Sequence, residues 1–243
     1  MLFLFCYMTG FTQDVGEPEG QTVTTKEWEL EFFLNTSGGG LGFQQGWTPD
    51  YFNKHFWEIN LLYNQHPKAV RARSADPEAT AYSYGKLYDL FFLRGGYGYQ
   101  RTLNHKPYWG GVQVRYTISG GFTLGIGIPV FVNIRYPGPN GFFIRETVQY
   151  DPENPNHTID KILGRAGFFK GFSKTALRPG FYAKTGLQFD FSQNDLRIHV
   201  LEVGGTIDMV FPFIRQMAFN KAKPFYLCAY VAYHFGKKKG FLE

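Results

Sequence analysis

The sequence predicts an all-β protein, more specifically a transmembrane up-and-down antiparallel β-barrel of eight strands with long extracellular loops. The 243 residues include 29 glycines, and aromatic residues make up 19% of the chain. Glycine is unfavourable inside helices and aromatic side chains pack well on pleated sheets, so this composition favours strands joined by tight turns. Apolar residues also recur at every second position, and the connections between these segments alternate between short and long, which is typical of a membrane barrel.

Eight segments show the two-residue period of a strand with one apolar and one polar face. In the clearest case, Phe181, Leu187 and Phe189 occupy one face, while Lys184 and Asp190 occupy the other. The predicted strands are residues 26–36, 39–47, 55–64, 86–102, 109–134, 178–191, 196–211 and 225–236.

Two of these strands are irregular. The fifth is long, and it is either one strand kinked at Gly120 and Gly121 or two strands. Its charge-free part is long enough for a transmembrane helix, but β-branched residues and Pro129 favour a strand. In the seventh strand the alternation changes phase near residues 199–201, which predicts a β-bulge.

The chain begins with a short apolar segment, residues 2–8, followed by small and polar residues up to Gln13. This pattern predicts a secretory signal peptide over residues 1–13 and a single barrel domain over residues 14–243. The basic residues that usually open such a leader are missing, so either the leader is short or the start lies elsewhere. Lys237 to Lys239 follow the last predicted strand and form a short basic tail.

The apolar face of the strands could contact either a hidden core, as in a soluble barrel resembling a lipocalin, or lipid. Charges of both signs on the polar face favour the second arrangement, since they can neutralise one another in a narrow lumen. Aromatic residues at the strand ends fit the two interfacial girdles of a membrane barrel, and they include Trp28, Trp47, Phe56, Tyr108, Trp109 and Tyr233. The candidate lumen charges are Glu29, Glu31, Glu58, Arg115, Lys184, Asp190, Glu202 and Asp208.

Several function classes are disfavoured by composition and spacing. Lysine and arginine outnumber aspartate and glutamate by only 25 to 20, and their scattered distribution argues against nucleic acid as a partner. Cys6 and Cys228 form neither a disulfide framework nor a zinc motif, and the six histidines lack metal-ligand spacing. We therefore expect no cofactor and no metal.

Several stretches of the chain are distinctive, and they are residues 66–68, 84–87, 110–116, 164–171, 179–187 and 234–238. They resemble a family of outer-membrane β-barrel proteins found in Bacteroidota. The resemblance covers most of the chain from about Glu27 and implies a small integral barrel of the outer membrane without a catalytic motif. It also suggests an accessory role in the barrel assembly machinery, and a secretion assembly is the other candidate complex.

The long connections are the candidate functional region, because the segment 135–177 is far longer than a hairpin needs and long ordered loops tend to carry function. It combines aromatic and basic residues, as protein interfaces do, and residues 212–224 add more. The candidate partner-binding residues are Phe142, Phe143, Arg165, Phe168, Phe169, Lys170, Phe213 and Arg215. The competing interpretation is that these residues only cap the mouth of the barrel.

These features predict a non-enzymatic subunit or docking element of a larger envelope complex, with outer-membrane lipid and other envelope proteins as partners. One alternative is a lipid-modifying enzyme that uses loop residues such as His66, Glu78 and Ser83, or His157 and Ser173. Another is a free-standing structural or surface-interaction barrel. A diffusive channel is disfavoured, since an eight-stranded barrel is only wide enough for its own side chains.

Overall fold

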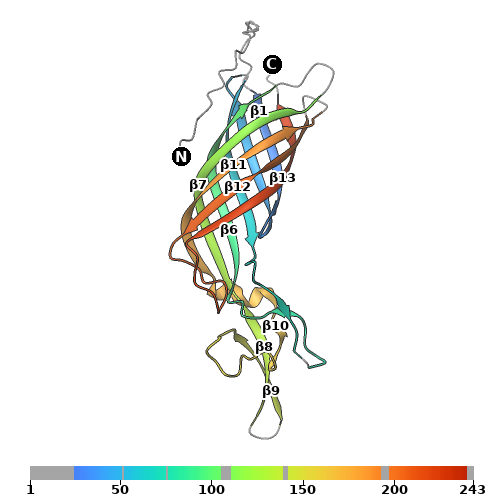
Figure 1. Cartoon of the computed structure of the whole chain (residues 1–243), viewed down its shortest axis with the longest axis vertical. Helices are drawn as coiled ribbons and strands as arrows, with labels where there is room; N and C mark the ends of the chain where they lie inside the picture. The colour runs from blue at the N-terminus through green and yellow to red at the C-terminus, as the bar shows by residue number, and fades with distance from the viewer. Residues whose placement is uncertain are drawn as a thin grey trace, which may run out of the picture.

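The computed structural model describes residues 25–50, 52–74, 76–104, 111–138, 142–192 and 197–239, and the predicted leader lies outside them. In this part of the chain, eight long strands close into an antiparallel barrel in the order β1-β13-β12-β11-β7-β6-β3-β2 (Figure 1). Each barrel strand pairs with the barrel strands that precede and follow it in the sequence, and β1 pairs with β13 to close the barrel. The predicted fold class is therefore confirmed. The barrel strands are β1 (Thr25–Asn35), β2 (Gly38–Thr48), β3 (Asn53–Asn64), β6 (Tyr88–Thr102), β7 (Gln113–Pro129), β11 (Ala176–Asp190), β12 (Arg197–Val210) and β13 (Phe225–Lys239).

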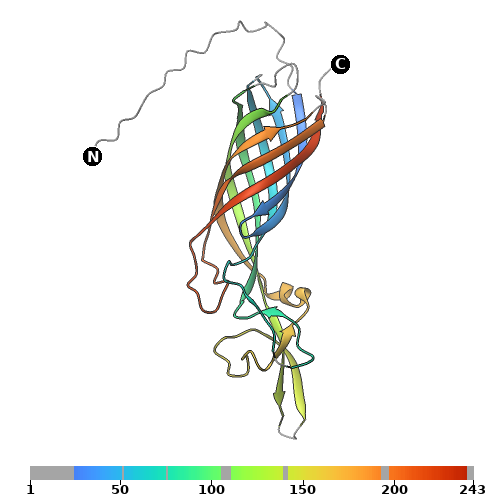
Figure 2. The same cartoon turned by 45° about the vertical axis from the view of Figure 1, so that its right-hand side comes forward.

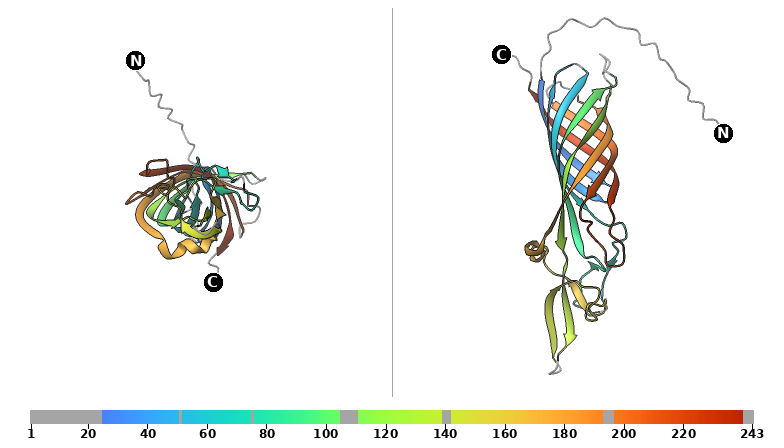
Figure 3. Two further views of the ribbon diagram at one scale, coloured as in Figure 1. Left: turned by 90° about the horizontal axis from the view of Figure 1, so that it is seen from below. Right: turned by 90° about the vertical axis from the view of Figure 1, so that its left-hand side faces the viewer.

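Every barrel strand has one face toward the interior and one face outward, as the two-residue period requires. In β11 the buried side chains include Tyr182, Lys184 and Gln188, while Phe181 and Leu187 are exposed. The right-hand view of Figure 3 shows these strands winding around the barrel at a marked tilt, which closure demands.

Two glycines allow the close approach of β6 and β7 near the middle of the barrel. Gly96 and Gly121 lie opposite each other, and a Cβ atom on either would collide with the backbone of the other strand. A Cβ on Gly96 would also collide with the Tyr182 hydroxyl, so this glycine leaves room for a large inward side chain.

The fifth predicted strand is two strands, and they divide at Val130 rather than at the glycine pair. β7 pairs with β6 and β11 through Gly120 and Gly121 without a register shift. It ends at Pro129, which has no amide hydrogen to continue the ladder. The chain then leaves the barrel as β8 (Phe131–Pro137). No helix in the described part of the chain is long and apolar enough to cross a membrane.

Two further predictions about the strands are wrong. β12 has no bulge near residues 199–201, because its pairing with β11 and β13 is continuous. Ile198 and Val200 face the interior together with Glu202, so the apparent phase change marks apolar side chains inside the barrel. Lys237 to Lys239 are not a tail, because β13 extends through them and they pair with β1.

The long connections emerge from the rim opposite the one where β1 begins and β13 ends, and they are folded (Figure 2). They contain a three-stranded sheet in the order β10-β8-β9, a short hairpin β4-β5 and a 3-10 helix, η1. We call these elements, with residues 211–224, the loop module. Its bounds are β4 (Arg71–Ala72), β5 (Tyr82–Ser83), β9 (Phe143–Gln149), β10 (Ile162–Arg165) and η1 (Phe168–Lys174).

The loop module has a hydrophobic core separate from the barrel interior. Its buried residues come from five segments that are distant in sequence, and they are Tyr82, Val130, Val132, Ile134, Tyr150, Ile162 and Ala218. Burial raises the pKa of the Tyr82 hydroxyl to about 12 and also raises that of Tyr150. Short strands with little stability of their own are thus held by long-range apolar contacts.

Candidate functional site: a packed lumen beneath a folded loop module

The outer surface of the barrel carries a continuous apolar belt. Outward positions that hold large exposed hydrophobic side chains include Leu30, Phe32, Leu41, Ile59, Leu61, Leu93, Ile118, Phe122, Phe181, Leu187, Val203, Ile207, Leu227 and Val231. Exposing so much apolar surface to water would be unfavourable, whereas lipid hydrocarbon accepts it. The belt is therefore the lipid-facing surface.

Aromatic and histidine rings border this belt at the rim where β1 begins and β13 ends. Trp47, His55 and Tyr97 stack on one another across β2, β3 and β6, with ring centroids 5.9 to 6.1 Å apart. Phe56, which the sequence placed with the girdle residues, instead points into the lumen and is fully buried. Tyr108 and Trp109, also expected at a girdle, lie outside the described residues.

A closed antiparallel barrel with a polar interior and an apolar exterior is the architecture of bacterial outer-membrane proteins. The localisation as an integral outer-membrane barrel is thus confirmed. In such barrels the short turns face the periplasm and the long loops face outward, which places the loop module outside the cell.

The eight predicted lumen charges all lie inside the barrel and are buried. Lys184 is at the centre of the main cluster. Its ammonium nitrogen lies 2.7 Å from a carboxylate oxygen of Glu58 and 3.7 Å from carboxylate oxygens of both Glu31 and Glu202. Ser119 and Tyr182 donate further hydrogen bonds to Glu58, at 2.7 and 2.8 Å.

His234 and Lys54 extend this cluster, and the sequence prediction missed both. His234 contacts Glu29 through Nδ1 at 3.1 Å and Glu202 through Nε2 at 2.9 Å. Lys54 pairs with Glu29 and with Glu27, the latter at 3.1 Å. His234 sits at an inward position of the predicted strand 225–236, so strand parity could have found it. Lys54 lies one residue before the predicted strand 55–64, and only the observed start of β3 at Asn53 places it in the barrel.

Two separate ion pairs flank the cluster. Arg94, also missed, donates through Nε to Asp208 at 2.8 Å and makes a second contact through its terminal nitrogen. A pairing through two contacts holds the guanidinium and the carboxylate in a defined orientation and also neutralises their charges. Arg115 pairs with Asp190 at 2.5 Å.

An apolar layer lies between the charged cluster and the loop module. It is formed by Phe33, Leu62, Leu90, Phe92, Val210, Ile214, Tyr226, Tyr230 and Ala232. Ile214 belongs to the loop 211–224, so this loop contributes to the closure of the lumen. Charged and apolar side chains thus both point into the interior of the barrel.

The candidate partner-binding residues do not form one surface. Phe143 begins β9 and Phe142 precedes it, in the β8–β9 hairpin that extends away from the barrel (Figure 1), and they are 62% and 80% exposed. Arg165, Phe168, Phe169 and Lys170 lie at η1, beside the barrel wall. Phe213 and Arg215 lie in the loop 211–224 and form the third location.

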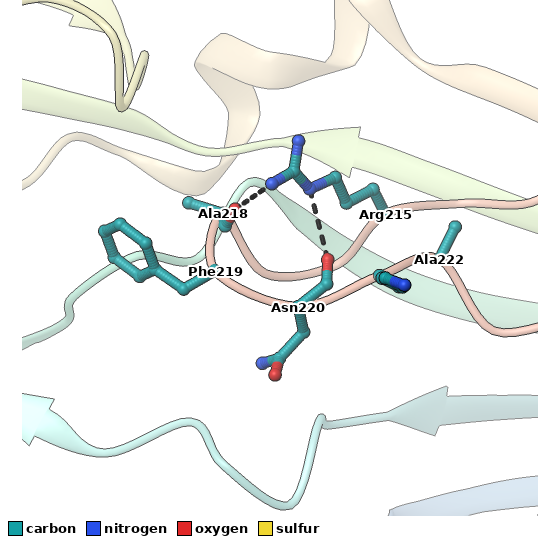
Figure 4. A pocket seen from close by; sticks show the side chains of 6 residues that line it. Arg215, Ala218, Phe219, Asn220 and Ala222 are labelled. Atoms are coloured by element: carbon teal, nitrogen blue, oxygen red, sulfur yellow. Dashed lines mark hydrogen bonds between the residues drawn. The ribbon is translucent and has the colours of Figure 1, made fainter.

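In that third location, the side chains make contacts within their own loop. Phe213 packs against Phe211 in a tilted arrangement, with ring centroids 5.1 Å apart. Arg215 donates hydrogen bonds to the backbone oxygens of Ala218 and Asn220, which holds the loop in a tight turn beside a shallow surface hollow (Figure 4). Its guanidinium thus stabilises the loop conformation.

The histidines considered for catalysis have structural hydrogen bonds. Nδ1 of His66 accepts a hydrogen bond from the backbone amide of Lys68, and Nδ1 of His157 accepts one from Asp151. Burial, together with the nearby charges of Lys223 and Lys68, lowers the pKa of His66. Glu78, from the same candidate set, forms an ion pair with Arg145. No cluster of three or more potential metal ligands occurs among the described residues.

Comparison with protein-family models and with curated proteins finds no match, so the resemblance to the Bacteroidota family stays a prediction. Among solved structures, the chain is similar to Neisserial surface protein A (8% identity, TM-score 0.37, 90% of this chain and 97% of that chain). It is also similar to Ail of Yersinia pestis, solved with the heparin analogue sucrose octasulfate (7% identity, TM-score 0.39, 89% and 99%). Similarity this low transfers no function, and the assignment as a membrane barrel rests on the strand order and the two faces described above.

Proposed function

We propose that this protein is a non-enzymatic surface-interaction barrel that docks another envelope protein through the tip of its β8–β9 hairpin. The observation that carries this proposal is the position of Phe142 and Phe143, exposed at the end of a module with its own hydrophobic core. Exposed aromatic residues beside arginine are typical of the energetic centres of protein interfaces.

The hairpin is braced as a rigid element, which lowers the entropic cost of binding. The Arg135 guanidinium lies over the Phe143 ring at 4.4 Å and pairs with Asp76 at 3.0 Å. Arg145 pairs with Glu78 on the neighbouring loop. The tip is thus fixed relative to the residues around β4 and β5.

Affinity purification from outer membranes in mild detergent tests the proposal. The wild-type protein should retain a partner, and the double variant Phe142→Ser/Phe143→Ser should lose most of it. Phe122→Ala is the matched control, because Phe122 is 72% exposed but belongs to the lipid belt, and it should retain the partner. A wild-type protein that is recovered alone and monomeric contradicts the proposal.

The same purification separates a transient docking element from a stable subunit of a larger assembly, such as the barrel assembly machinery or a secretion complex. A stable subunit should co-purify at fixed stoichiometry through several washes. The enzyme alternative makes a different prediction, since a strain lacking the protein would then have lipid A with an altered acyl or phosphate pattern.

A further inference from the structure

We infer that η1 is a membrane-anchoring segment, which inserts phenylalanine rings into the outer leaflet and places lysines on the phosphates of its lipid headgroups. This inference concerns a different surface from the hairpin tip and does not depend on the docking function. It begins from the position of η1 relative to the lipid belt.

The position of η1 along the barrel axis follows from the register of the strands next to it. Leu187 pairs with Tyr116 near the periplasmic rim, and Leu177 lies ten residues away along β11, beside Ile126. At the rise and tilt usual in barrels, ten residues span about 25 Å along the barrel axis, which equals the usual height of the apolar band. Leu177 therefore marks the outer edge of the band, and η1 ends three residues before it.

Contacts with the barrel wall hold η1 at this edge. Phe168 packs against the outward-facing Phe91 of β6, with ring centroids 6.1 Å apart. Gly171 lies so close to Pro129 of β7 that a Cβ atom there would collide with the backbone. Arg165, just before η1, pairs with the buried Asp89 of β6. One side of η1 is thus fixed on the lipid-facing side of β6 and β7.

The other side of η1 faces away from the protein and has the chemistry of a membrane interface. Phe169 and Phe172 stack on each other with ring centroids 5.6 Å apart, and they are 82% and 49% exposed. Lys170 is exposed between them, and its ammonium group has no partner among the described residues. Lys174 is exposed at the end of η1, 5.9 Å from the centre of the Phe131 ring.

This arrangement favours a lipid occupant over a protein. The exposed rings continue the apolar surface of the belt instead of forming an isolated patch, and aromatic rings are favourable at the boundary between acyl chains and headgroups. Basic side chains at the same level are attracted to anionic lipid headgroups. Phosphate-bearing lipid of the outer leaflet satisfies both features together.

Environment-sensitive labelling in vesicles tests the depth of η1. In the full chain carrying Cys6→Ser, a thiol is introduced by Phe169→Cys or by the control Phe142→Cys and labelled with NBD, while Cys228 is buried. The two positions have nearly equal exposure, 82% and 80%, but only Phe169 lies at the membrane edge.

We expect the label at position 169 to be quenched by nitroxide lipids and protected several-fold from aqueous iodide, relative to the label at position 142. Equal iodide quenching at both positions would overturn the inference. Protection at position 169 that arises only when a protein partner is added would overturn it as well.

The lysines have their own test. The double variant Lys170→Glu/Lys174→Glu should retain fewer lipid A molecules in native mass spectrometry than the control Lys221→Glu/Lys223→Glu, whose lysines are equally exposed in the loop 211–224. Equal retention by the two variants would show that phosphate recognition at η1 is wrong.

Discussion

Lys184 illustrates how much depends on a single side chain in this lumen. Its ammonium is fully buried and is shared by three carboxylates, those of Glu31, Glu58 and Glu202. It also lies 5.4 Å from the centre of the Phe33 ring and 5.9 Å from that of Tyr230. A buried charge is tolerated only when opposite charges and hydrogen bonds surround it, so these residues stabilise the barrel as a group.

Replacing Lys184 by methionine should therefore be strongly destabilising. Removal of one member of a buried ion pair typically costs about 3–5 kcal/mol, because the remaining charges are uncompensated. We expect a clearly lower urea midpoint for Lys184→Met, measured by tryptophan fluorescence in lipid vesicles. Lys221→Met, at an exposed position in the loop 211–224, serves as the control and should unfold like the wild type. A Lys184→Met midpoint unchanged from the wild type would show that the cluster contributes little.

At the scale of elements, the loop module and the barrel have separate cores and should unfold separately. The module core gathers Tyr82, Tyr150, Ile162 and Ala218 around β8, whereas the barrel depends on its closed hydrogen-bonded ladder. Elements with their own core open as cooperative units.

Ile162→Asp tests this separation, because Ile162 is fully buried in the module core. A buried, unpaired carboxylate should unfold the module and expose its loops to protease, while the barrel keeps its heat-dependent shift in gel mobility. Ile159→Asp, at a position 37% exposed, should leave both parts intact. Loss of the barrel in the Ile162 variant would mean that the two parts fold as one.

The sequence predicts an element well where apolar and polar residues alternate along it, and poorly where contacts with distant residues stabilise it. Alternation placed the barrel strands and the lumen charges, because each inward side chain is specified by its position in its own strand, but it wrongly joined residues 130–134 to the barrel. It could not show that His234 meets Glu29, since that contact joins the last strand to the first. The short strands of the module were missed for the same reason, because residues as distant as Tyr82 and Ala218 stabilise them.

For the whole molecule, the packed interior has a consequence for transport. An apolar layer that includes Phe33, Phe92 and Tyr226 lies above the charged cluster, and Ile214 packs into it from a loop. Barrels of this size have room only for side chains. The protein should thus serve as a membrane-embedded support for its loop module.

Planar bilayer recordings check this conclusion. The purified protein should produce no conductance above that of the bare membrane, since an eight-stranded barrel has room only for its own side chains. Phe92→Ala is a second variant for the same recording. It removes a buried ring from the apolar layer, and it should produce at most brief channel openings. Stable channels formed by the wild-type protein would contradict a packed lumen.

The pairing of β1 with β13 makes assembly an all-or-none event. The ladder runs from the pair Lys26 and Lys239 at one end to the pair Asn35 and Tyr230 at the other, so the seam requires residues 230–239. A nascent polypeptide that stops before residue 225 would present two unsatisfied backbone edges to hydrocarbon, which lipid does not tolerate. Closure must therefore wait until β13 has been synthesised, and termination before it should give rapidly degraded fragments rather than smaller barrels.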